Sequence, residues 1–402
     1  MQRLGFVKYM LSKCASSDTT SQDVLVRHLE DFVSIKIDTL LREEVVEYIR
    51  TRFPGNYYKV IKDKVKKITN DRKAKQLLSI NLQDVYLSSN ILPSKTGRLS
   101  KDDLNDLPYL LTSLGLCRKE NYSILVRGRL FVDLLQKYEL PAFKTYDSNH
   151  NPFLLDTKQQ MFFIFQFLEN DGDVINILYK KLLSLNKFSD RDAGDLLAES
   201  YRELADIYRQ NVRNIDGQKQ LQRILNIASS IEKWKGKMDT GGKSARTHNV
   251  TIRLEPFVDM GLLEKDNPHE YKYTIPNYSK LFFETLYELN NISDFLHTIF
   301  FEHINIAFNL KAKKVEDKNV IIKNYYNAWR ALKSPLGYSP IEEAALLAGI
   351  NSITKDRYFV EINEIISVLK DYQKKYPNLI RFNIDRTGKL TYVKFAGEIK
   401  PY

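Results

Sequence analysis

Two segments of the chain show the same order of features, and this repetition constrains the fold more than anything else in the sequence. In each, a helical pattern ends at a glycine, two short stretches of strand-like residues flank a polar turn, and a second helical pattern follows. The two glycines, Gly115 and Gly261, lie about 146 residues apart. Glycine often ends a helix because it adopts the left-handed backbone without strain. The sequence therefore predicts a mainly helical α+β fold with short β-hairpins.

The first segment is LSKDDLNDLPYLLTSLGLCRKENYSILVRGRLFVDLL. Ser100 can cap a helix that ends at Gly115, residues 116–118 and 123–126 can pair around the polar tip KEN, and the basic turn 127–129 begins the next helix. This order is typical of a winged helix. In that fold the helix before the hairpin lies in a DNA groove, and the hairpin tip meets phosphates.

The second segment and a weaker third one repeat this order. Residues 262–265 and 271–275 predict a hairpin with the tip DNPHE, and residues 278–286 predict the helix behind it. Near the end of the chain, residues 379–384 and 389–395 predict a hairpin around the turn DRTG, after three helical patterns. We therefore expect tandem winged-helix domains with a helical N-terminal lead-in.

Four parts follow from these patterns: 1–76, a helical N-terminal segment; 77–140, winged-helix module 1; 151–290, a helical linker with winged-helix module 2; and 291–402, winged-helix-like module 3. The triplet Asp171-Gly172-Asp173 predicts a turn between packing helices. Pro108 and Pro256 lie inside the helices proposed to enter the groove. Proline costs a helix interior about 3 kcal/mol, so these helices are expected to kink or to start later.

Charge and cysteine content narrow the class of protein. The 402 residues include 61 Lys and Arg against 50 Asp and Glu, a net charge of +11 that favours a polyanionic partner. Cys14 and Cys117 fall in unrelated segments, so we expect neither a disulfide framework nor a thiolate metal cluster, as fits a reducing cytoplasm. The first apolar stretch is too short for a secretory signal, and no stretch is long enough to span a membrane.

The strongest basic stretch is residues 233–253, with six Lys or Arg against one Asp. A helix starting near Ser244 places its first turns where a recognition helix reaches base edges. A flexible basic loop with phosphate contacts only is the alternative here, and solvated surface is the alternative for the first module. The predicted DNA-binding residues are Lys243, Ser244, Arg246, Thr247, Asn249 and Arg253 in the second module, and Lys95, Arg98, Lys101, Arg118, Lys119, Arg127 and Arg129 in the first.

The stretches LTSLGLCRKENYSILVRGRLF and FVDMGLLEKDNPHEYKYTIPNYSKLFF resemble the tandem winged-helix DNA-recognition domains of type IIS restriction endonucleases. The resemblance covers roughly residues 80–290. It implies sequence recognition without cleavage, because this chain leaves no room for the separate nuclease domain of such enzymes.

Catalytic patterns are weak. GKMDTGGKS has one residue too many for a phosphate-binding P-loop, and His297 and His303 are six apart, on different faces of a helix. Asp385, Glu398 and Lys400 have the order of a D-ExK nuclease, which uses Mg²⁺. We expect no catalytic residues, no metal and no cofactor, and thus no enzyme, with a Mg²⁺-dependent nuclease as the alternative.

The sequence therefore predicts a cytoplasmic, nucleoid-associated protein that binds double-stranded DNA. The leading hypothesis is the DNA-reading subunit of a multi-protein restriction or antiphage defence system, whose protein partner carries nuclease, helicase or ATPase activity. A plasmid replication initiator, a transcription regulator and a helical protein-binding scaffold remain alternatives.

Overall fold

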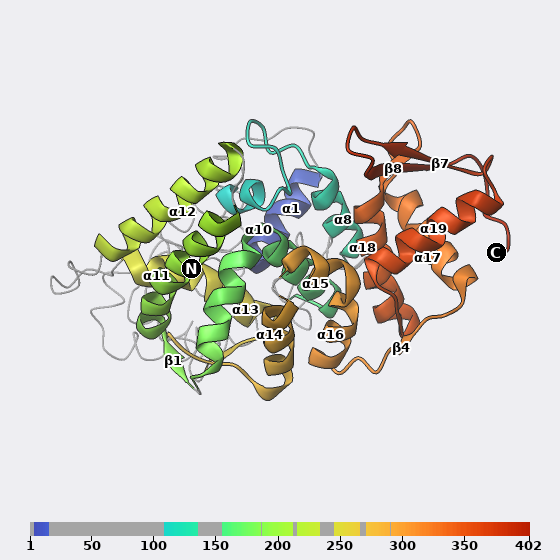
Figure 1. Cartoon of the computed structure of the whole chain (residues 1–402). Coiled ribbons are helices and arrows are strands. Elements are labelled where there is room, and N and C mark those ends of the chain that lie inside the picture. Colours follow the sequence, from blue (N-terminus) through green and yellow to red (C-terminus); the bar gives the residue numbers. More distant parts are fainter. Residues whose placement is uncertain are drawn as a thin grey trace, which may run out of the picture. The chain divides into compact units, whose positions relative to one another are not determined.

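The computed structural model describes residues 4–15, 108–135, 155–185, 187–211, 215–233, 245–265, 271–289 and 291–402 (Figure 1). The chain divides into two compact units, Met1–Asp156 and Thr157–Tyr402. The described residues are mainly helical with small sheets of two or three strands, which confirms the coarse α+β prediction.

The first unit contains the hairpin predicted for module 1. Residues 108–113 are helical, Gly115 follows with a φ of +65°, and Cys117 and Ile124 form an antiparallel bridge. The pairing is limited to this bridge and its flanking hydrogen bonds, such as that from the Leu125 amide to the Leu116 carbonyl (2.9 Å). The hairpin is therefore present but shorter than predicted.

Two helices of the same unit, α1 (Leu4–Ala15) and α8 (Val126–Leu134), pack against each other. Helix α8 also lies directly on the hairpin. A Cβ added at Gly128 would lie 2.4 Å from the carbonyl oxygen of Leu116, so only glycine permits this close approach.

The second unit begins with α10 (Thr157–Leu183), a long helix with non-helical backbone at Asp171 (φ −134°, ψ 15°). The predicted turn at 171–173 is therefore a kink within one helix. Gly172 beside it packs against Ile292, where an added Cβ would come within 2.7 Å of the side chain.

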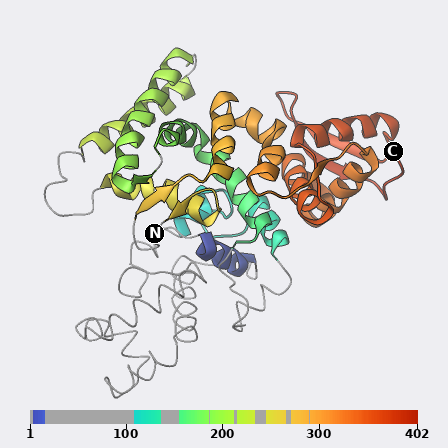
Figure 2. The ribbon, with the colours of Figure 1, turned by 90° about the horizontal axis from the view of Figure 1, so that it is seen from below.

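After the kinked helix, the chain forms β1 (Phe188–Ser189), α11 (Asp190–Asn211), α12 (Ile215–Lys233) and α13 (Ala245–Asp259). Figures 1 and 2 show α11 and α12 side by side. Pro256 lies within α13, which continues to Asp259.

Three short strands complete this part of the unit. Strands β2 (Glu264–Lys265) and β3 (Lys272–Thr274) pair antiparallel, β1 pairs with the other edge of β3, and α14 (Asn277–Leu289) follows. The sheet order is β1-β3-β2. The hairpin was predicted, whereas β1 was not.

Helices α15 (Ile292–Thr298) and α16 (Phe300–Ala307) lead into the C-terminal part. Its helices are α17 (Lys318–Leu332), α18 (Ile341–Asn351) and α19 (Ile362–Lys375). A π-helical turn, η2 (Ser352–Asp356), follows α18. Strand β4 (Lys313–Lys314) pairs in parallel with β6 (Tyr358–Phe359).

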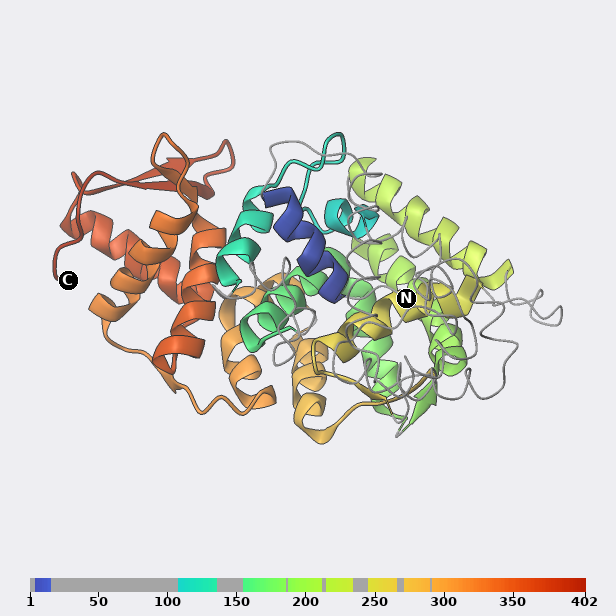
Figure 3. The same cartoon turned by 180° about the vertical axis from the view of Figure 1, so that it is seen from behind.

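The C-terminal sheet consists of β5 (Tyr338–Pro340), β7 (Ile380–Ile384) and β8 (Leu390–Phe395), in the order β5-β8-β7. Figures 1 and 3 show α17, α18 and α19 on one side of it. The three helices and the hairpin of the predicted third copy are present nearly at the predicted bounds.

The two three-stranded sheets therefore share one arrangement. In each, the first strand follows a helix, a hairpin comes last, and the final strand lies in the centre. We call residues 157–289 the first repeat and residues 318–395 the second repeat.

Candidate nucleic-acid interface

Helix α19 of the second repeat has one buried apolar face and one exposed polar face. Ile362, Ile365 and Leu369 are fully buried. The exposed side chains are Asn363, Ser367, Lys370, Lys374 and Lys375, which we call the α19 face. A helix with this distribution presents hydrogen-bond donors and positive charge to solvent while its apolar stripe holds it in the core.

The start of α19 is fixed by a buried carboxylate. Glu361 is the N-cap residue and forms a capping box with Glu364. Its carboxylate also accepts hydrogen bonds from the amides of Phe301 (3.1 Å) and Glu302 (2.9 Å) at the start of α16. Burial raises the pKa of Glu361 to about 7. One side chain thus joins the first turns of α16 and α19.

The hairpin after α19 has a structured, basic tip. Oδ1 of Asp385 accepts hydrogen bonds from the Thr387 amide (2.8 Å), the Thr387 hydroxyl (2.6 Å) and the Lys389 amide (3.0 Å). The hydrogen bond from the Thr387 hydroxyl is the largest cause of the lowered pKa of Asp385. Arg386 and Lys389 are exposed at this tip.

Helix α13 occupies the corresponding place in the first repeat but is enclosed. From Asn249 to Asp259, no side chain of α13 is exposed. Arg253 is only 11% exposed, and its guanidinium forms an ion pair with Asp171 (2.6 Å) and donates to the hydroxyl of Tyr201 (2.7 Å). Arg253 therefore joins α13 to α10 and α11, away from the exposed surface expected of a base-reading residue.

A second buried network joins α13 to its hairpin. The ammonium of Lys265 on β2 (2.8 Å) and the hydroxyl of Tyr273 on β3 (2.6 Å) both donate to Oε1 of Glu255. The side chains of Lys265 and Glu255 are 3% and 1% exposed. This network fixes the hairpin of the first repeat against α13.

The other predicted DNA-binding residues are scattered. Helix α13 begins at Ala245, close to the predicted start, and Arg246 and Thr247 lie in its first turn. In the first unit, Arg118, Lys119 and Arg129 are exposed and Arg127 is partly buried. Lys95, Arg98, Lys101, Lys243 and Ser244 lie outside the described residues, as does the P-loop-like stretch.

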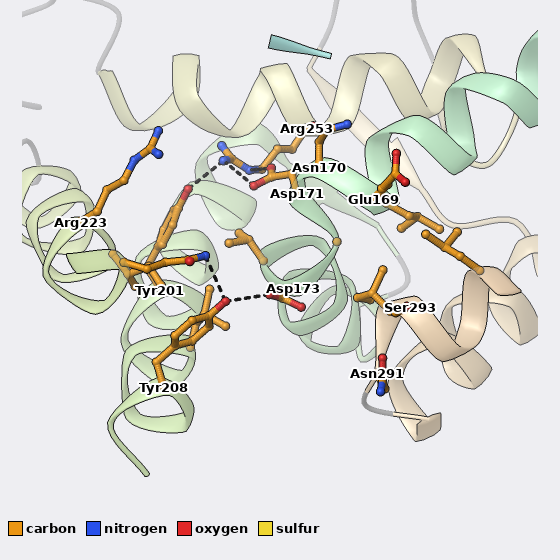
Figure 4. A pocket seen from close by; sticks show the side chains of 18 of the residues that line it. Glu169, Asn170, Asp171, Asp173, Tyr201, Tyr208, Arg223, Arg253, Asn291 and Ser293 are labelled. Carbon is orange, nitrogen blue, oxygen red and sulfur yellow. Dashed lines mark hydrogen bonds and ion pairs between the residues drawn. The ribbon is translucent and has the colours of Figure 1, made fainter. Parts of the chain in front are cut away.

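The kink of α10 forms the floor of a pocket of about 700 Å³ within the second unit (Figure 4). Tyr208 donates to Asp173 (3.2 Å) on one side of it, and Arg253 pairs with Asp171 on the other. Arg223 and Lys389 add positive charge, and the remaining polar lining residues are Glu169, Asn170, Tyr201, Gln220, Asn291, Ser293, His297 and Glu342. The lining therefore combines both signs of charge with hydroxyl and amide groups.

This pocket corrects the prediction that the chain has no candidate catalytic site. The sequence offered no candidate site apart from the D-ExK alternative, whereas the structure contains a polar pocket built from segments far apart in the chain. The expectation of no enzyme, which depended on the lack of such a site, is withdrawn.

The nuclease alternative is also wrong. Asp385 lies at the tip of the β7–β8 hairpin, while Glu398 and Lys400 follow the far end of β8, a strand of six residues. Such a strand spans on the order of 17–20 Å, so the two carboxylates cannot hold one metal ion. The backbone of Lys400 instead exchanges hydrogen bonds with the Tyr372 hydroxyl (2.8 and 2.9 Å).

Among the described residues, no group of three or more His, Cys, Asp or Glu side chains is arranged to hold a metal ion. His297 lies near Glu342 (3.9 Å), and burial lowers the pKa of His303. The two cysteines, which fall in unrelated segments of the sequence, are both buried and free, and their thiols share a hydrogen bond between α1 and the hairpin bridge.

No helix in the described part of the chain has the length and apolar character needed to cross a bilayer. Comparisons with protein-family models, with curated proteins and with solved structures found no match to this chain.

Proposed function

We propose that the second unit contains two winged-helix modules and binds double-stranded DNA through the second of them. The repeated arrangement supports this proposal: in each repeat a helix directly precedes a hairpin, and an earlier short strand pairs with the last strand, giving the sheet orders β1-β3-β2 and β5-β8-β7. In winged-helix proteins this helix enters the major groove and the hairpin contacts the backbone.

The second repeat is the stronger candidate for the groove contact. Its α19 face is exposed and carries Lys370 and Lys374, and its hairpin tip carries Arg386, which is also exposed. These basic side chains supply the phosphate contacts that position a protein on a duplex. Asn363 and Ser367, in the first half of the helix, are the side chains placed to meet base edges.

Binding of a labelled duplex, measured by fluorescence anisotropy at several salt concentrations, tests this proposal. The double variant Lys370→Ala/Lys374→Ala should bind more weakly and reduce the slope of log affinity against log salt by about 2, because each phosphate contact contributes about 0.9. The control is Lys311→Ala/Lys323→Ala, which removes the same charge from exposed positions outside α19 and the hairpin. Equal slopes for the two variants would refute a contact through α19.

The resemblance to type IIS recognition domains extends the proposal to a chain that reads a DNA sequence for a partner enzyme. Selection of bound molecules from a pool of random duplexes tests this extension. An enriched common sequence supports it, and a bound pool as diverse as the input contradicts it.

A further inference from the structure

The sheet of the second repeat has an outer face that the helices leave uncovered. Inner residues Ser339, Val393 and Ile380 are fully buried. Residues opposite one another in an antiparallel pair share a face, so the register identifies the outer residues. They form two rows across the sheet, Tyr338–Lys394–Arg381 and Pro340–Tyr392–Asn383.

This outer face combines flat aromatic rings with positive charge. Tyr392 is 45% exposed, and the ammonium of Lys394 lies 5.1 Å from the centre of the Tyr338 ring. Arg381 is exposed and forms no ion pair with the described residues. The two rows contain no carboxylate, and the nearest acidic residue along the hairpin, Asp385, accepts its hydrogen bonds within the turn.

The geometry suits unpaired nucleotides better than a duplex. Tyr338 and Tyr392 lie on neighbouring strands, offset by two residues, and such diagonal neighbours are about 7–8 Å apart. A tyrosine ring can stack only on the face of a base, and duplex DNA hides those faces within its own stack. Aromatic side chains on open sheets, with basic side chains for the backbone, are the usual platform for single strands.

We propose that the outer face of the β5-β8-β7 sheet binds single-stranded nucleic acid. Two successive bases stack on Tyr338 and Tyr392, and Arg381 and Lys394 contact the phosphates. This site is separate from the α19 face, because α19 packs against the inner side of the same sheet. The protein thus has one surface for a duplex and another for a separated strand.

Binding of a labelled 15-nucleotide oligo(dT) to the full chain tests the site. The variant Tyr338→Ala/Tyr392→Ala should bind it at least about 25-fold more weakly, because each of the two stacked bases contributes a factor of about five to more than a hundred. Tyr338→Phe/Tyr392→Phe keeps the rings and should bind like the wild type. The control Tyr109→Ala/Tyr278→Ala removes two other exposed rings and should also leave binding unchanged.

If Tyr338→Ala/Tyr392→Ala does not fold, a variant that removes one positive charge from the outer face still tests the site. Arg381→Ala removes an exposed side chain and should reduce the salt slope for oligo(dT) by about 0.7, while leaving the duplex slope nearly unchanged. Oligo(dT) affinity equal in the Tyr338/Tyr392 alanine variant and its control would overturn the inference. Competition by poly-glutamate as strong as that by unlabelled oligo(dT) would overturn it too, because the face would then be a site for acidic protein.

The duplex measurement separates this inference from the proposed function. If the α19 lysine variant binds duplex normally while the tyrosine variant loses oligo(dT) binding, the single-strand site stands and the duplex proposal fails. The reverse pattern retains the duplex proposal and rejects the single-strand site.

Discussion

Helices α13 and α19 occupy equivalent places in two repeats of one arrangement, yet α19 has an exposed polar face, whereas no side chain of α13 is exposed from Asn249 to Asp259, the part whose burial the structure describes. In the first repeat, α11 packs against both α13 and the additional helix α12, and α13 also contacts α10. In the second repeat, a short π-helical turn and β6 stand where α12 would be, and α19 keeps its polar face in solvent. A repeated fold therefore does not carry a repeated interface, because contacts with α10 and α11 bury Arg253 of α13 while the polar face of α19 stays in solvent.

The largest expected effect concerns the buried network of the first repeat. Glu255→Ala removes the carboxylate that pairs with the buried ammonium of Lys265, and breaking a buried pair costs about 3–5 kcal/mol. Urea unfolding followed by circular dichroism measures this loss. The double variant Glu255→Leu/Lys265→Met removes both charges and should recover most of it. A loss below about 1 kcal/mol in the single variant would show that α13 and its hairpin are not held by this network.

The buried carboxylate of the second repeat should behave differently, since backbone amides hold Glu361 in place of a cation. Its pKa is raised from 4.5 to about 7, so the folded protein binds this proton more tightly than the unfolded chain does. Stability from this group is therefore complete below pH 4.5 and is lost as the pH rises toward 7, by about 3 kcal/mol in total.

Glu361→Gln removes this titration. The difference in melting temperature between the variant and the wild type should shift in favour of the variant as the pH rises from 4.5 to 7. A difference that stays constant over this range would mean that Glu361 does not titrate there. A shift in favour of the wild type would mean that folding lowers the pKa of Glu361 instead of raising it.

Two glycines lie where the connecting helices α15 and α16 pack against the repeats. Substitution by alanine should lower the stability of the protein by different amounts at these two positions. A Cβ at Gly349 would lie 2.3 Å from the fully buried ring of Phe301, whereas one at Gly172 would lie 2.7 Å from the partly exposed side chain of Ile292. Overpacking costs about 1–3 kcal/mol. The loss of stability should lie near the upper end of this range for Gly349→Ala and near the lower end for Gly172→Ala. Thermal unfolding of the two variants measures both losses. Equal losses would indicate that Phe301 moves as easily as Ile292.

The smallest effect is expected for the ion pair at the hairpin tip of the second repeat. Lys389 contacts Glu342 at 2.8 Å, but its side chain is 63% exposed. Exposed pairs contribute about 0–1 kcal/mol. Lys389→Ala should therefore lower the free energy of unfolding by less than 1 kcal/mol, far less than Glu255→Ala, and a loss as large as that of Glu255→Ala would remove the contrast between the repeats.

The hairpins and most helices were predictable because their signals are local. Gly261 and the turn DRTG mark the hairpins, and the helical periods of residues 318–375 predict three helices near their observed places. Strands β1 and β5 were missed because two or three residues show no periodicity, and their partners lie far along the chain. For Phe188, the partner is Tyr273.

The candidate sites were harder to predict for the same reason. The pocket combines the α10 kink with side chains from α11, α12, α13 and α15, and no local pattern signals that meeting. The burial of Arg253 likewise depends on Asp171 and Tyr201, which are distant in sequence. An available signal was missed at α19, whose polar face follows from the spacing of Asn363, Ser367, Lys370 and Lys374.

The hydrogen bonds to Asp385 affect the entropy of any contact made by the hairpin tip. Three donors within the turn already fix residues 385–389, so the backbone loses little conformational freedom when a ligand arrives. Ordering the side chain of Arg386 then costs only about 0.5–1.5 kcal/mol. The residue that resembled a metal ligand in the sequence instead prepares the tip for contact before any partner is present.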